Sequence, residues 1–260
     1  PTTAGFNNAF GAIENGLADA VDLPGWNYKP MFYEQIHNDH PEWTAYGSET
    51  ESCVSSRGVY DLPVTVERGV VKDHLLCSSY DLAAPGWGYS PDDEFVAQDE
   101  CPFIFGEFVW TGFDYLGEPT PHKTEWPSRS SYFGIVDLCG LPKDRYFLYQ
   151  SKWANTDVLH LLPHWNWSGH EGETIPVHCY TNYDAAELFV NGESQGIRSK
   201  SNAEDHVDLP VDWPGTKFTE CLYTETARAK FGACRLIWND VTYVPGELKV
   251  VALNADGSPA

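Results

Sequence analysis

The stretch Tyr46-Gly47-Ser48-Glu49-Thr50-Glu51-Ser52 places a carboxylate directly after a short apolar run. The run Trp43–Tyr46 is predicted to be a strand, because aromatic residues favour strands and the Gly-Ser pair favours its end. Where parallel strands alternate with helices, side chains at the C-terminal strand ends can carry out catalysis. Acids after short apolar strands are nevertheless common. This segment alone therefore favours a solvated loop acid, with a catalytic Glu49 as the alternative.

The chain before residue 115 alternates between strand and helix patterns. Predicted strands are 3–6, 20–23, 43–46 and 103–110, and predicted helices are 9–17, 30–38 and one that begins at Ser90-Pro91-Asp92-Asp93. This last start pairs a capping serine with a proline and acids that suit the positive end of a helix dipole. Residues 50–89 show little periodicity. The alternation predicts a parallel sheet, and its four strands are half of the eight that a closed barrel needs.

From about residue 155 the pattern changes to short strands without helices. The predicted strands are 158–162, 175–181, 186–190, 194–197, 236–238 and 247–253. Asn191-Gly192 is a strong hairpin turn, because both residues tolerate the positive φ that such turns require. Residues 198–233 interrupt this pattern with a polar stretch. Short strands at this spacing predict a sandwich of immunoglobulin type.

Composition and charge exclude several classes of protein. The 260 residues are 42% hydrophobic, which excludes a disordered chain, and no apolar run is long enough for a transmembrane helix. The net charge of −22 argues against nucleic acid and anionic membranes as partners. The seven cysteines form no Cys-x-x-Cys pair, so no zinc site is predicted, and only Cys221 and Cys234 suggest a bridge. The compartment stays open, with a periplasmic or secreted location favoured over the cytoplasm.

A second segment, Phe105 to Pro119, joins a buried strand to an aromatic and acidic turn. Trp110 stands at the end of that strand, and Asp114 follows it. Tryptophan beside acids is what the apolar face and the hydroxyls of a sugar require. Taken alone, Trp110 would be assigned to the core.

Together these segments resemble one family. Residues 47–60, with Gly-Ser-Glu-Thr and Ser-Ser-Arg-Gly-Val-Tyr, resemble the nucleophile region of glycoside hydrolase family 2 β-galactosidases. Residues 106–121, 126–137 and 142–145 are similar to the last strand of that family's barrel and the segment after it. Residues 161–167 and 187–192 resemble the immunoglobulin-like domain that follows the barrel in one branch of the family. The similarity covers nearly the whole chain except 198–233.

The resemblance implies a fold and a division of the chain. Residues 1–154 would be the C-terminal half of a (β/α)₈ TIM barrel, with strands five to eight, and residues 155–260 an immunoglobulin-like β-sandwich. The fold class is thus α/β plus all-β. The partners implied are a β-galactoside substrate and a missing N-terminal half of the same polypeptide, with room for a homo-oligomer. Neither a cofactor nor a metal is implied.

The resemblance also implies roles for individual residues. Glu49 would be the nucleophile of a retaining exo-β-galactosidase and would form a covalent glycosyl-enzyme. Asn27 and Tyr28 would stand beside it, with the tyrosine hydroxyl orienting the carboxylate. Trp110 would form the floor of the sugar subsite. Trp87 and Asp114 are weaker candidates for substrate contact.

Two departures from the family pattern bear on activity. Glu51 stands where the family usually has a small residue; we expect it to turn away, because a carboxylate facing the site would raise the pKa of the nucleophile. The acid/base glutamate of the family follows barrel strand four in an Asn-Glu motif, and no such motif precedes Thr3. Retaining hydrolysis needs two carboxyl groups. The 260-residue chain alone is therefore predicted to be inactive.

Two alternatives remain. A non-catalytic carbohydrate-binding protein would use Trp110, Trp87 and the sandwich to hold glycans, and the missing acid/base residue favours it. A β-glucuronidase or a β-mannosidase would share the barrel. A uronate needs a basic pocket, and near the site motifs the chain offers only Arg57 and Arg129. The excess of acidic residues in the chain thus argues against a uronate as the substrate.

Overall fold

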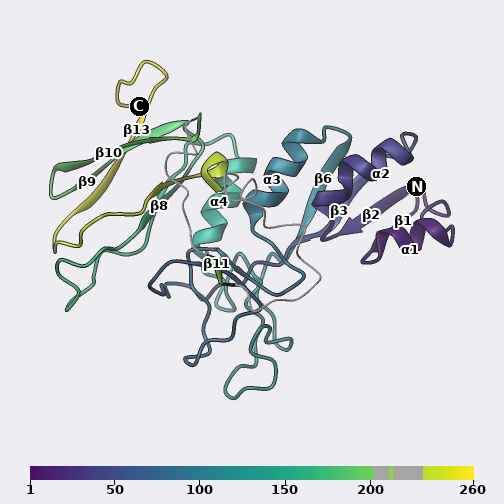
Figure 1. Cartoon of the computed structure of the whole chain (residues 1–260), viewed down its shortest axis with the longest axis horizontal. Coiled ribbons are helices and arrows are strands. Elements are labelled where there is room, and N and C mark those ends of the chain that lie inside the picture. The colour runs from purple at the N-terminus through teal and green to yellow at the C-terminus, as the bar shows by residue number, and fades with distance from the viewer. Residues whose placement is uncertain (202–210, 213–230) are drawn as a thin grey trace.

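The computed structural model describes residues 1–201, 211–212 and 231–260. The parallel sheet, the helices α3 (Pro91–Glu100) and α4 (Asp144–Trp153), and the antiparallel strands follow one another across the molecule, with the N-terminus and the C-terminus at opposite ends (Figure 1). Among the described residues no helix is long and apolar enough to cross a membrane. Cys221, which was predicted to pair with Cys234, lies outside the described residues.

The first part of the chain forms the predicted parallel sheet. Its strands lie in the order β1 (Thr3–Phe6), β2 (Leu23–Asn27), β3 (Ala45–Glu51) and β6 (Ile104–Trp110). The intervening helical elements are α1 (Ala9–Glu14), η1 (Pro30–Phe32), α2 (Tyr33–Asp39) and α3 (Pro91–Glu100). Sequential strand order with helices between neighbours is the arrangement that strand–helix alternation predicts. Closure of this sheet into a barrel stays a prediction.

The predicted strand 20–23 is wrong in its position. β2 begins at Leu23, the last residue of the predicted range, and continues through Pro24 and Gly25 to Asn27. A Cβ at Gly25 would lie 2.5 Å from the Ser48 side chain, so the glycine allows β3 to approach closely. Pro24-Gly25 is therefore part of β2 because β3, which is distant in sequence, packs closely against the glycine.

The start of α3 follows the prediction. The Asp93 carboxylate accepts hydrogen bonds from the backbone N–H of Ser90, at 3.3 Å, and from its hydroxyl, at 2.9 Å. These contacts link the residue before the helix to the first turn. Residues 50–89, which had little periodicity, contain the short strands β4 (Val66–Arg68) and β5 (Ala83–Ala84), and β11 (Val211–Asp212) pairs with β4.

The second part is antiparallel, as predicted. One sheet has the order β10 (Glu193–Ser199), β9 (Ala185–Val190) and β13 (Leu248–Leu253), and the other has the order β12 (Arg235–Trp238), β8 (Val177–Thr181) and β7 (Leu159–Leu162). Asn191 and Gly192 have φ values of 50° and 83°, as their hairpin requires. Leu188 of the first sheet and Leu236 of the second belong to one buried cluster. The two sheets therefore pack face to face.

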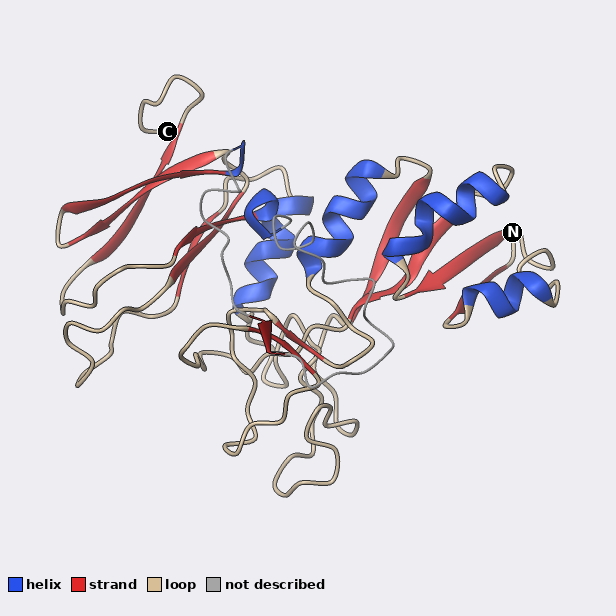
Figure 2. Cartoon of the chain, in the orientation of Figure 1, coloured by secondary structure: helices blue, strands red, loops and turns tan. Residues whose placement is uncertain are grey.

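The helix α4 (Asp144–Trp153) joins the two parts, and a buried cluster extends across the junction. Val66, Phe95 and Leu148 of the first part share this cluster with Leu162 and Ile237 of the second. The boundary at residue 154 marks the change from alternating strands and helices to short strands alone. The segments on its two sides nevertheless share one hydrophobic core. The loops after β3 and β6 gather on one side of this junction (Figure 2).

Candidate active site

The strand ends bring several of the predicted site residues together. Asn27 pairs with Glu49 in the register of β2 and β3, and Glu51 pairs with Trp110 in the register of β3 and β6. Because parallel strands run in the same direction, these residues lie at the same edge of the sheet. This edge is where ligands bind in open parallel sheets.

Glu49 is held by Tyr28 through two contacts. The tyrosine hydroxyl donates to Glu49 Oε2 at 2.7 Å, and the Tyr28 backbone N–H donates to the Glu49 carbonyl at 2.8 Å. Burial and the nearby Glu49 carboxylate raise the pKa of Tyr28 well above its usual value. The phenol therefore keeps its proton at neutral pH and remains a donor to a partly exposed carboxylate.

Asn27 is buried behind this pair, with 5% of its surface exposed. Its Oδ1 accepts a hydrogen bond of 2.5 Å from the Ser48 hydroxyl. A Cβ at Gly5 would lie 2.8 Å from that Oδ1, so the glycine makes room for the amide. The Asn27 side chain is thus fixed in position next to the Tyr28–Glu49 contact.

Trp110 lies beside the same pair and is half-buried. It packs against a cluster that contains Tyr28 and Tyr89, and its ring lies edge-on to that of Tyr115 at 6.0 Å. One part of the indole therefore contacts the core while another part remains open to solvent. This position is compatible with a surface for sugar stacking.

Glu51 turns away from Glu49, as expected. It is fully buried, and its Oε1 lies 3.1 Å from Nε of Arg145 on α4. Burial raises the pKa of Glu51, and the Arg145 guanidinium acts in the opposite direction. The Arg145 side chain also donates to the Phe133 carbonyl at 2.7 Å. The second acid of the motif thus anchors the end of β3 to α4.

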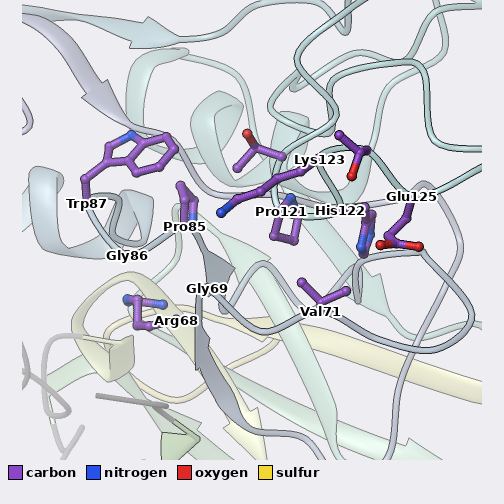
Figure 3. A pocket seen from close by; sticks show the side chains of 12 residues that line it. Arg68, Gly69, Val71, Pro85, Gly86, Trp87, Pro121, His122, Lys123 and Glu125 are labelled. Carbon is purple, nitrogen blue, oxygen red and sulfur yellow. The ribbon is translucent and has the colours of Figure 1, made fainter. Parts of the chain in front are cut away.

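The other two predicted residues lie apart from this group. Lys143 Nζ lies 2.7 Å from the Asp114 carboxylate, which also accepts from the Gly134 backbone N–H at 2.7 Å. These contacts hold together the loop after β6. Trp87 lines a separate cavity with Pro85 and Lys123 (Figure 3). The substrate roles of Asp114 and Trp87 stay predictions.

Three residues that no sequence pattern indicated support the site. Ser48 holds Asn27, Tyr89 packs with Tyr28, and Arg145 neutralises Glu51. Only Ser48 lies within the motif around Glu49, and its spacing from Asn27 gave no indication of the contact. In the described part of the chain no group of three or more His, Cys, Asp or Glu side chains is arranged to hold a metal ion.

Comparison with known proteins gives similarities along most of the chain. Residues 172–259 match a domain family described as a domain of unknown function, DUF4982. The chain is 40% identical over 226 residues to the beta-galactosidase BoGH2A of Bacteroides ovatus, an alignment of 83% of this chain and 26% of the relative. It is 35% identical over 152 residues, 54% of this chain and 14% of the relative, to a Formosa agariphila protein provisionally named as a beta-glucuronidase.

Solved structures agree in fold. The crystal structure of a beta-glycosidase from Bacteroides vulgatus has a TM-score of 0.68 and 28% identity, and the match covers 98% of this chain and 35% of that one. A glycosyl hydrolase family 2 member from Bacteroides cellulosilyticus has a TM-score of 0.61 at 23% identity, over 99% of this chain and 27% of that one. The chain spans about a quarter of the length of the Bacteroides ovatus relative. These similarities confirm the resemblance that the motifs indicated, and the chain belongs to glycoside hydrolase family 2.

Proposed function

We propose that the protein containing this chain is a retaining exo-β-galactosidase, and that Glu49 is its nucleophile. The single observation that carries the proposal is the 2.7 Å hydrogen bond from the Tyr28 hydroxyl to Glu49 at the C-terminal edge of the parallel sheet. This contact aims one carboxylate oxygen and leaves the other for attack on the anomeric carbon. The identity with the Bacteroides ovatus beta-galactosidase favours galactose as the terminal sugar.

In this reaction Glu49 displaces the leaving group and forms a covalent glycosyl-enzyme, which water then hydrolyses. Tyr28 orients the nucleophile, Asn27 lines the site beside it, and Trp110 is the floor on which the sugar stacks. The proton for the leaving group comes from a carboxylic acid outside residues 1–260. Four acids near the site within the chain have other partners: Glu51 contacts Arg145, Glu107 contacts Thr50, Asp114 contacts Lys143 and Glu118 contacts Tyr115.

We also propose that residues 1–154 are the second half of a (β/α)₈ barrel, followed by an immunoglobulin-like domain. β1 and β6 are the outer strands of the sheet in the described residues. On β6, Phe105 and Phe108 are 56% and 66% exposed although both pack against Tyr46. Exposed aromatic residues beside an open strand edge favour a further segment that covers them. Without that segment, residues 1–260 should not hydrolyse glycosides.

The experiment that tests the proposal is covalent labelling of the full-length protein. A 2-fluoro β-galactoside should trap the glycosyl-enzyme, and peptide mapping should place the label on Glu49. Glu49→Gln should abolish labelling and lower the hydrolysis rate by several orders of magnitude, because covalent catalysis is lost while binding is kept. Glu51→Gln is the neighbouring control. A label on Glu51, Glu107 or Glu118 would overturn the assignment.

A second candidate is β-glucuronidase activity, because two Formosa agariphila relatives are provisionally named as beta-glucuronidases. Parallel assays with nitrophenyl β-galactoside and nitrophenyl β-glucuronide separate the two. Higher kcat/KM on the galactoside is expected, since the chain is strongly acidic and a uronate carboxylate needs a basic pocket.

A further inference from the structure

The strand that carries Glu49 is not regularly paired around this residue. The register between β3 and β6 shifts between Gly47 and Thr50. On the other side of β3, the register with β2 shifts between Trp26 and Asn27. Such irregularities re-aim side chains and interrupt the backbone ladder, and they are common beside active sites. The position of Glu49 therefore depends on side-chain contacts as well as on backbone hydrogen bonds.

Glu107 of β6 bridges the shift between β3 and β6. It lies opposite Gly47 in the register, and its carboxylate accepts a hydrogen bond from the hydroxyl of Thr50, further along β3. Thr50 is fully buried and is the next residue after Glu49. Because successive side chains of a strand point to opposite faces, Thr50 holds β3 from the side away from Glu49. The contact with Glu107 thus fixes the strand behind the proposed nucleophile.

Glu94 of α3 lies against the same strand. A Cβ at Gly47 would lie 3.3 Å from Glu94 Oε1 and 2.9 Å from the Tyr33 hydroxyl, so the glycine lets both groups reach the backbone of β3. The Glu94 side chain is fully buried and accepts hydrogen bonds from Tyr33 and from Gln98, each at 2.9 Å. Side chains of α2 and α3 therefore hold this carboxyl group in place.

Tyr89 connects Glu94 to the other residue that holds Glu49. Its hydroxyl donates to Glu94 Oε2 at 2.8 Å, and its backbone N–H donates to the Glu51 carbonyl, also at 2.8 Å. Its ring packs with Tyr28, whose hydroxyl donates to Glu49. A displacement of Tyr89 would therefore move both the end of β3 and the group that orients the Glu49 carboxylate.

The surroundings of these two glutamates are mostly neutral or acidic. The titratable side chains that face them from the neighbouring elements are Tyr33 of α2, Glu51 of β3, Tyr89, Asp93 of α3, and Tyr149 and Lys152 of α4. The cations of α4 have other acids as partners. Lys152 lies 2.6 Å from Asp99, and Arg145 lies 3.1 Å from Glu51.

Glu94 and Glu107 therefore favour sharing one proton. Burial raises the pKa of both carboxyl groups, and with the added effect of the Glu94 charge that of Glu107 rises to about 8. With one proton, the pair carries a single negative charge, and the three donors to Glu94 stabilise it. Loss of that proton would leave two interacting carboxylates, which repel each other.

We propose that Glu94 and Glu107 are positioning residues for the nucleophile, and that they hold Thr50 and Tyr89 so that the end of β3 presents the Glu49 carboxylate to the substrate. This inference rests on the proposed function, because it takes Glu49 as the nucleophile. Repulsion between two charged carboxylates would displace the hydroxyl groups that they hold. The alkaline limit of activity is therefore set by two acids on the far side of the strand that carries the nucleophile.

The first test is the pH dependence of kcat/KM in the full-length protein with 2,4-dinitrophenyl β-galactoside. The leaving group of this substrate departs without a proton, so ionisation of the proton donor does not affect the step. For the unmodified protein, kcat/KM should fall above about pH 8. Glu107→Gln cannot ionise and keeps an acceptor for the Thr50 hydroxyl. In this variant the fall should move upward by at least about one pH unit.

Glu100→Gln is the matched control for this measurement. Glu100 is exposed and lies on α3, the helix that carries Glu94. The control removes one carboxylate outside the network, so kcat/KM should fall at the same pH as in the unmodified protein. Circular dichroism at each pH separates this fall from unfolding.

The second test is removal of the Thr50 hydroxyl. Thr50→Val should lower kcat/KM about tenfold to hundredfold, because a small misplacement of a reacting group is costly. The inhibition constant of galactose should change less than about twofold, since galactose binds without attack by Glu49. Thr50→Ser keeps the hydroxyl and should restore most of the activity. Should Thr50→Val not fold, Tyr89→Phe, which loses only the hydroxyl that contacts Glu94, gives the same comparison.

An alkaline fall at the same pH in Glu107→Gln and in the unmodified protein would overturn the proposal, and so would full activity of Thr50→Val. If the unmodified protein hydrolyses neither the galactoside nor the corresponding glucuronide, it is the proposed function that fails. Hydrogen exchange of the backbone amides of residues 45–52 then decides the role of the pair. At about pH 9 these amides should exchange faster in the unmodified protein than in Glu107→Gln, and at about pH 6 they should exchange equally. Equal exchange at both pH values would reject that role.

Discussion

At the scale of single residues, the main finding is how closely Tyr28 and Glu49 are fixed to each other. The backbone contact sets the register of the two strand ends, and the side-chain contact sets the orientation of the carboxylate. Tyr28 has a φ of 56°, which few residues other than glycine adopt. Strained backbone of this kind gathers at functional sites, where the surrounding structure holds it in place.

Trp110 gives a prediction at this scale. Trp110→Ala should reduce kcat/KM by an amount equivalent to more than about 1 kcal/mol, because a stacking platform acts on the transition state as well as on the bound sugar. Thermal stability should fall less than activity does, since part of the indole is open to solvent. The measurement is kcat/KM and melting temperature of the full-length protein, with Trp126→Ala as a control. Parallel losses of activity and stability would instead assign Trp110 to the core.

At the scale of elements, a buried acidic network lies between β6, β3 and α3. Glu107 of β6 accepts a hydrogen bond from the Thr50 hydroxyl of β3, while Glu94 of α3 accepts from Tyr33 at 2.9 Å and from Tyr89 at 2.8 Å. Burial, followed by the charge of Glu94, raises the pKa of Glu107 to about 8, while the hydrogen bonds with Thr50 and Gln98 act in the opposite direction. The buried Glu94 and Glu107 carboxyl groups therefore favour holding a proton between them in the folded protein.

This network predicts a pH dependence of stability. A carboxyl group whose pKa is raised by folding stabilises the folded state below its unfolded pKa, and this contribution is lost as the pH rises through the folded value. Stability should therefore fall between about pH 5 and pH 8. Glu107→Gln should reduce that fall, because the amide resembles the protonated acid. Melting temperatures of the full-length protein across this range provide the measurement. Glu34→Gln, at an exposed position on α2, is the control and should leave the change of melting temperature with pH as it is in the unmodified protein. The same change with pH in both variants would contradict the prediction.

At the scale of the whole molecule, a buried ion pair links the two parts of the chain. Arg235 of β12 donates from Nε to Asp92 of α3 at 2.9 Å, and both side chains are fully buried. The same guanidinium donates to the Tyr80 carbonyl at 2.8 Å. Together with the shared apolar cluster, these contacts make the sandwich a structural support for α3, which packs against β3.

Removing one partner of this pair should therefore destabilise the whole molecule. Asp92→Asn removes the carboxylate that is hydrogen-bonded to the buried Arg235 guanidinium, and we expect a loss of about 3–5 kcal/mol in the free energy of unfolding. Asp99→Asn is a matched control on the same helix. Its partner Lys152 lies 2.6 Å away at an exposed position, where such a pair contributes about 0–1 kcal/mol. Denaturant unfolding of the full-length protein measures both values. Equal losses of unfolding free energy in the two variants would show that the Asp92–Arg235 pair contributes little to holding the two parts of the chain together.

The amino-acid sequence specifies several local elements directly. The serine, proline and acids at 90–93 specify a helix start through contacts within one turn, and Asn191-Gly192 specifies a hairpin through two φ angles. It also determined the family, because the residues around Glu49 form a long and specific pattern. The proposed nucleophile was found from that resemblance, since a carboxylate after a strand is too common to identify a site.

Contacts that form only in the folded chain give several of the acids and aromatics their partners. Glu51 and Glu49 are two residues apart in one strand, yet the first pairs with Arg145 and the second with Tyr28. The same holds for Asp114, whose partner Lys143 lies on a later segment, and for Trp87, whose cavity needs the loop around His122. Propensity and capping act between neighbours in the chain, so a sequence can show them directly. Burial and charge pairing depend on segments that meet only after folding, and these set the chemistry of each carboxylate.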